Sequence, residues 1–231
     1  MQIIGIFTAV GVIVIGFMER ETSKISAFDW HALVIILMGS FGAVLLGSGV
    51  KDFLRTIIHL RELIPGLKLV TKETKNLDQQ RQQIEKLWLE GNRTDAIRVA
   101  ETNNSKVVKE TIKLLLEKSR KETVDKKFTD IDHEFIDLLQ PSANNWELMS
   151  RLGPSFGIIG TITGMVTLFK NFGSGANLGS SMSLALLATL YGISFGAGIA
   201  GPIGHYLSKI LDERLDVHQR YEKTIKYLNN L

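Results

Sequence analysis

Four long stretches of the chain carry no charged side chain and are dominated by apolar residues. They run over Met1–Met18, Trp30–Val50, Leu152–Phe169 and Asn171–Ser208. A helix that crosses the roughly 30 Å hydrocarbon core of a bilayer needs about 20 mostly apolar residues, and about 17 are tolerated. The pattern therefore predicts four transmembrane helices. Their expected bounds are Ile3–Met18, His31–Val50, Leu152–Phe169 and Ser181–Gly204.

The first stretch has a second interpretation, as the apolar region of a signal peptide. Such a peptide begins with basic residues and ends at small residues that a peptidase cleaves. No basic residue precedes Ile3, and Phe17, Met18 and Glu19 offer no cleavage site. These features favour a helix that is retained in the membrane.

The segment between the second and third spans is polar, with apolar residues at helical spacing. It predicts a helix over Asp52–Ile64 that Pro65 and Gly66 end, and a Gly91 cap between two further helices. No strand pattern is present. The expected helices of the segment are Asp52–Ile64, Asn76–Leu89, Arg93–Thr102, Ser105–Ser119, Phe128–Leu139 before Pro141, and Asn144–Arg151 running into the third span.

The charge distribution turns this pattern into a domain division. The 231 residues carry 27 basic and 24 acidic side chains, a net charge of +3 that is too balanced to indicate a nucleic-acid partner. Between Lys51 and Arg151 lie 19 of the basic and 17 of the acidic residues. The expected parts are two spans over residues 1–50, a helical cytoplasmic domain over 51–143, two spans over 144–208 and a cytoplasmic tail over 209–231. The fold class is an all-α membrane protein.

Basic residues near the ends of the spans predict the orientation, because Lys and Arg concentrate on the cytoplasmic side. They follow the second span at Lys51, Arg55 and Arg61 and the fourth at Lys209, Arg214 and Arg220. Both termini and the charged segment are therefore expected in the cytoplasm. The absence of cysteine agrees with this orientation and decides nothing further.

Glycine faces mark the last two spans. Small side chains let helix backbones approach closely in lipid, where little hydrophobic force acts between helices. Helical spacing puts Gly157, Gly160 and Gly164 on one face of the third span, and Gly192 and Gly196 on one face of the fourth. Simple helix packing is the expected role of any single pair.

Two threonines interrupt these faces at matching depth. Thr161 lies between Gly157 and Gly164, and Thr189 lies three residues before Gly192. Each hydroxyl has two expected roles: a hydrogen bond to its own helix at i−4, or, since both helices carry one, a narrow path lined by hydroxyls. Ion sites inside membranes normally use charged residues or histidine, and the four spans contain none between their edges. If the chain conducts ions, a partner must supply the carboxylate.

Enzymatic chemistry has no specific support in the sequence. The five histidines show no metal-ligand spacing, and neither a nucleophile–base constellation nor a phosphate-binding glycine loop is present. We expect no catalytic residue, no metal and no cofactor beyond a permeating H⁺ or Na⁺.

The two glycine faces carry a family resemblance. The segment from Leu152 to Val166 reads LGPSFGIIGTITGMV and resembles the third-helix motif of the MotA/TolQ/ExbB family, Pro-x-x-Gly, two hydrophobic residues, Gly-Thr-x-x-Gly. The segment ALLATLYG at Ala185–Gly192, followed by Pro202, is similar to the fourth-helix signature of MotA-type stator subunits, although Ser194 stands where that signature has an aliphatic residue. Four spans around one large inner segment also look like MotA rather than three-span ExbB or TolQ.

The resemblance implies a function and partners. MotA-type subunits form a pentamer around the single-span helices of a B-subunit dimer, whose Asp binds the permeating ion and whose periplasmic domain binds peptidoglycan. Ion flow turns the A ring, which drives the flagellar rotor. Carried over by position, Thr161 and Thr189 match the pore threonines, and Pro154 and Pro202 match the prolines tied to conformational switching. The implied location is the bacterial inner membrane.

The charged segment departs from the MotA pattern. Trp88 stands three residues before Gly91, where MotA proteins carry a basic residue, and the run Glu90–Ala100 resembles the corresponding helix pair of ExbB and TolQ. Candidate rotor-facing charges are Arg93, Asp95, Arg98 and Glu101, and a solvated helix face is the favoured alternative. The hypotheses for the whole chain are therefore a stator A subunit, an ExbB/TolQ-like energiser of an envelope process, and a non-conducting membrane scaffold.

Overall fold

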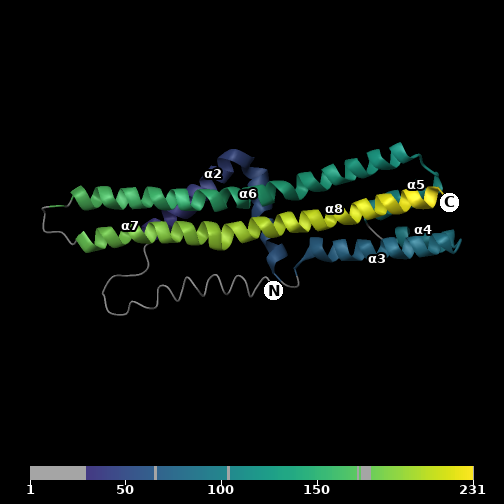
Figure 1. Ribbon diagram of the computed structural model, residues 1–231, viewed down its shortest axis with the longest axis horizontal. Helices are drawn as coiled ribbons and strands as arrows, with labels where there is room; N and C mark the ends of the chain where they lie inside the picture. The colour runs from purple at the N-terminus through teal and green to yellow at the C-terminus, as the bar shows by residue number, and fades with distance from the viewer. Residues whose placement is uncertain (1–29, 65–66, 103–104, 171, 173–177, 231) are drawn as a thin grey trace. The chain divides into compact units, whose positions relative to one another are not determined.

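The computed structural model describes residues 30–64, 67–102, 105–170, 172 and 178–230, and every regular element among them is helical (Figure 1). The expected all-helical fold is thus confirmed for these residues. The expected first span, Ile3–Met18, lies outside them. The elements are α2 (Trp30–Ile58), the 3-10 helix η1 (His59–Leu63), α3 (Leu69–Leu89), α4 (Arg93–Glu101), α5 (Lys106–Leu116), α6 (Lys121–Lys170), α7 (Leu178–Ile193), the π-helix η2 (Ser194–Ala200) and α8 (Gly201–Asn229).

Three helical stretches of the described chain are long and apolar enough to cross a membrane. They are Trp30–Leu63, Lys121–Lys170 and Ala185–Asn229. The first two contain the predicted second and third spans, the last contains most of the predicted fourth, and each also includes a charged stretch. The described part of the protein is therefore built on helices of membrane type.

The chain forms two compact units. The span unit comprises the described residues within Met1–Leu63 and Pro141–Tyr206, and the charged unit comprises those within Ile64–Gln140 and Leu207–Leu231. Helices α6 and α8 each contribute residues to both units. The C-terminal residues, expected only as a tail, are thus part of the charged unit.

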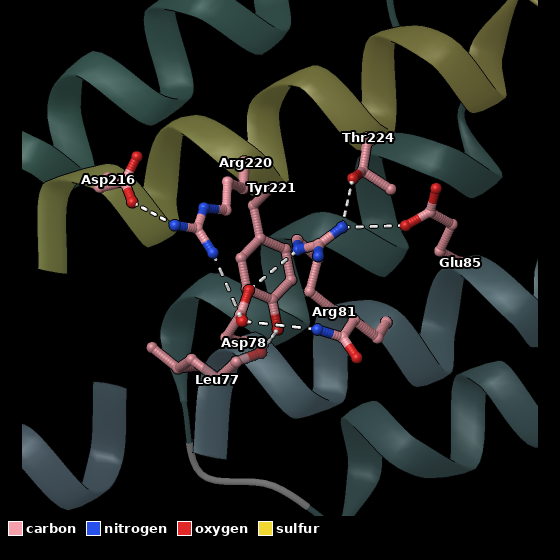
Figure 2. Close-up of polar contacts among 9 residues, drawn as sticks. Leu77, Asp78, Arg81, Glu85, Asp216, Arg220, Tyr221 and Thr224 are labelled. Carbon is pink, nitrogen blue, oxygen red and sulfur yellow. Dashed lines mark hydrogen bonds and ion pairs between the residues drawn. The ribbon is translucent and has the colours of Figure 1, made fainter. Parts of the chain in front are cut away.

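The charged unit has its own apolar core, to which α3, α4, α5, the first part of α6 and the last part of α8 contribute. Polar contacts at its edge join α3 to α8 (Figure 2). The Tyr221 hydroxyl donates to the Leu77 carbonyl at 2.7 Å, and the Arg81 guanidinium reaches the Thr224 hydroxyl at 3.1 Å. The buried core residues are Leu77, Ile84, Ala96, Ala100, Val107, Val108, Ile112, Leu114, Leu115, Val124, Phe128, Ile131, Val217, Tyr221, Ile225 and Leu228.

The cap between α3 and α4 forms as the sequence predicts. Gly91 has a positive φ of 77°, a conformation that glycine adopts without strain. The Gly91 and Asn92 amides donate to the Trp88 and Leu87 carbonyls at 3.2 and 2.9 Å, which satisfies two otherwise open acceptors at the end of α3. The helix itself begins earlier than expected, at Leu69 rather than Asn76.

One expected helix boundary is wrong, and a second one is a kink. Pro141 does not end the helix before it, because α6 runs through it without a break. A proline removes one backbone hydrogen bond, and side-chain contacts hold the next turn: Ser142 bonds His59 at 2.7 Å and Asn145 donates to Thr56 at 2.8 Å. The helix expected over Asp52–Ile64 corresponds to the piece of α2 after a kink at Gly49, which becomes η1 at His59.

Candidate functional site: a hydroxyl pair between two glycine faces

Within the span unit, α6 and α7 touch backbone to backbone. A Cβ added to Gly157 would lie 2.9 Å from the Ala188 carbonyl oxygen, and one added to Gly192 would lie 2.8 Å from Gly157 Cα. At Gly160 the added atom would lie 2.5 Å from Ala188 Cβ. These separations are shorter than carbon–carbon contacts in proteins, about 3.5–4.0 Å. The helices can approach this closely only because these positions carry no side chain.

The same contact extends in both directions along the helices. An added Cβ at Gly164 would lie 2.8 Å from Ala185 Cβ, and one at Gly196 would lie 2.5 Å from the Ser150 carbonyl oxygen. The structure therefore brings all five glycines that the sequence singles out into one interface. Gly153, which the sequence argument does not name, belongs to it as well, with an added Cβ 2.8 Å from the Gly192 carbonyl oxygen.

Thr161 and Thr189 meet inside this interface. Their hydroxyl oxygens are within hydrogen-bond distance of each other, and both side chains are partly buried. Thr161 Oγ1 also lies 3.1 Å from its own helix's Gly157 carbonyl and 3.0 Å from the Ala185 carbonyl across the interface. A hydroxyl has one proton to donate, so when Thr161 donates to either carbonyl, Thr189 donates to Thr161. The expected bond to its own helix is thus available to Thr161 beside the contact with Thr189, and the role of the pair in an ion path remains a prediction.

Neighbouring threonines of α6 behave differently. The Thr163 hydroxyl donates to the Ile159 carbonyl at 2.9 Å, and the Thr167 hydroxyl donates to the Thr163 carbonyl at 3.0 Å. Both side chains are exposed and bond within their own turn, which is the ordinary arrangement for threonine in a membrane helix. The contact between helices thus distinguishes Thr161 from the other threonines nearby.

The two matched prolines lie at either side of the π-helical segment η2. Pro154 of α6 packs on it, since a Cβ added to Gly196 would lie 2.7 Å from Pro154 Cδ. Pro202 is the second residue after the segment and has no amide proton for the preceding turn. The Gly201 amide donates to the Gly196 carbonyl, an i→i−5 bond. Wide turns of this kind are rare and are common at functional sites.

No ionised group or metal cluster belongs to the hydroxyl pair. The α6 residues from Leu152 to Phe169 and the helical run from Leu178 to Ser208 contain no Asp, Glu, Lys or Arg. Among the described residues no group of three His, Cys, Asp or Glu side chains is placed to hold a metal ion. The site can donate and accept hydrogen bonds or lend oxygen atoms to a cation, and it has no charge of its own.

The four candidate rotor-facing charges lie together on α4, in the charged unit. Arg93, Arg98 and Glu101 are exposed. The Asp95 carboxylate is 3.7 Å from Arg98, and the Asp95 backbone amide donates to the Asn92 side-chain oxygen, which caps the helix. Arg93 lies over the Trp88 ring, with its guanidinium carbon 5.3 Å from the ring centre. Local contacts therefore engage three of the four, and their role toward a partner remains a prediction.

A polar cluster that was not predicted from the sequence fixes the start of the third span. Asn145 of α6 is buried and its amide donates to Ser48 and Thr56, at 3.2 and 2.8 Å. The Trp146 indole donates to the Thr56 carbonyl at 3.4 Å. An uncharged amide next to a predicted span was the available signal, but only the tertiary fold shows which residues it joins.

The fold and the site together define a helical protein of membrane type, whose two closest-packed spans enclose a hydroxyl pair. Comparison with known proteins specifies this class further. The family model described as "MotA/TolQ/ExbB proton channel family" matches residues 99–220, more than half of the chain. The chain belongs to this family.

Individual relatives agree with the family model. "Motility protein A" of Aquifex aeolicus is 35% identical over 81 residues, which is 35% of this chain and 32% of the relative, so the match spans about a third of that protein's length. The solved structure titled "Structure of C. jejuni MotAB" has a TM-score of 0.82 at 15% identity and covers 99% of this chain and 89% of that one. A flagellar MotAB stator complex from Bacillus subtilis has a TM-score of 0.80 at 20% identity, covering 98% and 88%. These structures share the fold of this chain.

Proposed function

We propose that the chain is the A-type subunit of an ion-driven rotary stator, which forms an H⁺ or Na⁺ channel together with a B-type subunit and converts ion flow into torque. The hydroxyl pair of Thr161 and Thr189 carries this proposal. The pair joins α6 to α7 within an interface rich in glycine and alanine, and family membership makes ion conduction the relevant chemistry.

The hydroxyl pair suits ion transfer in two ways. A threonine hydroxyl both donates and accepts, so two in contact can pass a proton, and the nearby Gly157 and Ala185 carbonyls add oxygen atoms that suit Na⁺. The spans supply no carboxylate to hold the ion. We therefore assign that group to the partner, a B-type subunit with one membrane helix, a transmembrane Asp and a peptidoglycan-binding domain. The titles of both similar solved structures name a MotAB assembly.

The proposal includes the setting of this subunit. It lies in the bacterial inner membrane with four spans, including Ile3–Met18, and both termini and the charged unit face the cytoplasm. Several copies, five by resemblance, surround the B-type helices. The flagellar rotor is the proposed output, and the α4 charges Arg93, Asp95, Arg98 and Glu101 are the candidate contacts to it.

An energiser of the ExbB/TolQ type is the second candidate. The family model covers these proteins too, and the run Glu90–Ala100 at the start of α4 resembles their helix pair. The two candidates share the channel and differ in what the ion flow drives. A scaffold that only packs through its glycine faces differs from both because it conducts nothing.

Flux measurements on the purified chain and its complex separate these candidates. The full chain is reconstituted in vesicles with a pH-sensitive or Na⁺-sensitive dye, alone and with the single-span protein encoded beside it. We expect no flux from the chain alone, flux from the complex, and loss of that flux when the partner's membrane Asp becomes Asn. A complex that conducts nothing supports the scaffold. Two results together support the energiser: flux with a partner that has a TonB- or TolR-like domain, and unchanged motility of cells from which the gene for this chain is deleted.

A further inference from the structure

Helix α2 changes direction where its charge-free part ends. Gly49 has φ 76° and ψ 164°, a left-handed conformation that divides α2 into two helical pieces. A Cβ added there would meet no atom within 4 Å, so the backbone conformation, and not a close neighbour, is what requires glycine. Trp30–Val50 is uncharged, and Lys51 is the first charged residue after it. The kink therefore lies at the end of the span.

The side of the second piece that faces the protein is fixed by α6. Asn145 donates both to Ser48, before the kink, and to Thr56, about two turns after it. Thr56 is 1% exposed, and its carbonyl accepts the Trp146 indole proton. A single buried amide thus joins the two sides of the bend. The other face of the piece points away from the protein in a fixed direction.

That outer face is an aliphatic stripe. Val50, Leu54, Ile57 and Ile58 follow the i, i+4, i+7, i+8 spacing of one helix face. They are 65%, 53%, 44% and 52% exposed. Basic residues adjoin the stripe. Lys51 is exposed, and Arg55 is partly exposed and forms an ion pair with Asp52 at 3.3 Å. An exposed aliphatic face beside basic side chains is typical of a helix that lies in a membrane interface.

The preceding span indicates what covers the stripe. Leu46, three residues before the kink, is 91% exposed, as expected for a side chain that faces acyl chains. The stripe begins at Val50, the last residue of the charge-free stretch, where the end of the hydrocarbon region is expected. Lys and Arg at this depth attract anionic headgroups. Continuity with the span and the sign of the charge both favour lipid over protein as the occupant.

We propose that residues Val50–Ile58 form an interfacial helix that binds anionic phospholipids, with the aliphatic stripe among the upper acyl chains and Lys51 and Arg55 at the headgroup phosphates. The kink at Gly49 and the Asn145 amide hold the helix against the bilayer surface. This binding site is separate from the hydroxyl pair and does not depend on whether the chain conducts ions.

Spin labels measure the depth of the stripe directly. The chain contains no cysteine, so single variants need no altered background. The full chain carrying Leu54→Cys or Ile58→Cys is placed in nanodiscs of equal parts phosphatidylcholine and phosphatidylglycerol. Collision rates with oxygen, which enriches in lipid, and with a polar nickel chelate report the depth. Leu46→Cys serves as the lipid control, and Glu117→Cys, exposed in the charged unit, as the water control.

We expect both stripe labels to fall between the two controls. Labels as accessible to nickel as position 117 would overturn the proposal. A second result would also overturn it: labels shielded from both oxygen and nickel, together with disulfide formation between the cysteine variants of two copies. A second copy of the chain would then cover the stripe.

Charge is tested separately. The double variant Lys51→Gln/Arg55→Gln is compared with Lys109→Gln/Lys113→Gln, whose lysines are also exposed but lie on α5. We expect phosphatidylglycerol to raise the Tm of the parent chain over pure phosphatidylcholine. The first variant should lose at least half of that rise and the second should keep it. Equal behaviour of the two variants would contradict binding of headgroups by Lys51 and Arg55.

Discussion

The close contact between α6 and α7 makes a quantitative prediction for Gly160→Ala. The new Cβ would lie 2.5 Å from Ala188 Cβ, whereas nonbonded carbon atoms prefer about 3.5–4.0 Å. The helices must therefore separate by roughly 1 Å at this point, which forfeits about a quarter to a half of the dispersion energy of the atom pairs involved. Overpacking of this kind costs about 1–3 kcal/mol. In lipid no hydrophobic gain offsets it, and we expect a loss of about 2 kcal/mol of unfolding free energy.

The matched controls lie in the same unit. Gly42→Ala places its Cβ where no atom lies within 4 Å, so it should be neutral, or stabilising by up to about 1 kcal/mol through helix propensity. Ala188→Gly removes the atom that Gly160→Ala would strike, and the next atom, Ala188 Cα, is 3.9 Å away. The double variant Gly160→Ala/Ala188→Gly should therefore recover at least half of the loss.

Reversible unfolding of the full chain in mixed micelles is followed by circular dichroism as dodecyl sulfate is added. It gives the unfolding free energies of the parent, the two single variants and the double variant. The double-mutant cycle should show a favourable coupling of about 1–2 kcal/mol. Two outcomes would refute the close contact between α6 and α7. One is equal stability of Gly160→Ala and Gly42→Ala. The other is a double variant whose loss of unfolding free energy equals or exceeds the sum of the losses in Gly160→Ala and Ala188→Gly.

Three further predictions test other parts of the fold. Gly49→Ala should lower the unfolding free energy by about 1–2 kcal/mol because alanine is strained at a φ of 76°. Gly47→Ala lies in the same helix, also with no atom within 4 Å of the added Cβ, and should not lower it. Equal losses in chemical unfolding would argue against the kink. Tyr221→Phe should cost about 1 kcal/mol through loss of the 2.7 Å bond to Leu77. Burial raises the pKa of the Tyr221 phenol above its usual value of about 10. The stability that Tyr221 contributes is therefore complete below about pH 10 and is lost as the pH rises, because the unfolded chain releases the proton first. Between about pH 9 and about pH 11 the parent should lose more unfolding free energy than the variant, and equal losses would count against this role. Arg214→Met should cost about 2–3 kcal/mol, since the buried guanidinium donates to His218 at 3.1 Å and to Glu73 at 2.9 Å; a melting temperature equal to the parent's would contradict this role.

Local patterns determined the elements that could be predicted from the sequence. The charge-free stretches predicted membrane-type helices, since the bilayer sets their length and composition whatever the neighbours are. The Gly91 cap was predictable for a similar reason, because the required positive φ is a property of one residue. Thr161 and Thr189 lie at matching depth on two faces of small residues, and this placement was enough to pair them as a hypothesis. Their hydroxyls do lie within hydrogen-bond distance of each other.

Contacts between distant segments account for what the sequence did not predict. Pro141 normally favours a helix end, but the bonds from Ser142 and Asn145 to α2 and η1, more than 80 residues away, hold the next turn in place. The last residues of α8 resemble a tail in sequence, and only tertiary contacts, such as the bonds from Tyr221 to Leu77 and from Arg81 to Thr224, show that they pack on α3. Neither the π-helical turn before Pro202 nor the kink at Gly49 has a sequence signal specific enough to predict it.

The central claim is that the Thr161–Thr189 hydroxyl pair belongs to an ion pathway, and ion flux through the reconstituted complex tests it most directly. Thr161→Val and Thr189→Val keep the side-chain shape and remove the hydroxyl, and Thr163→Val removes a hydroxyl that bonds only within its own turn. A hydrogen bond to a charged group is worth about 1.5–3 kcal/mol, so each pair variant should lower the flux about tenfold or more. Thr163→Val should leave it nearly unchanged. Undiminished flux in both pair variants, with the complex intact, would contradict the account.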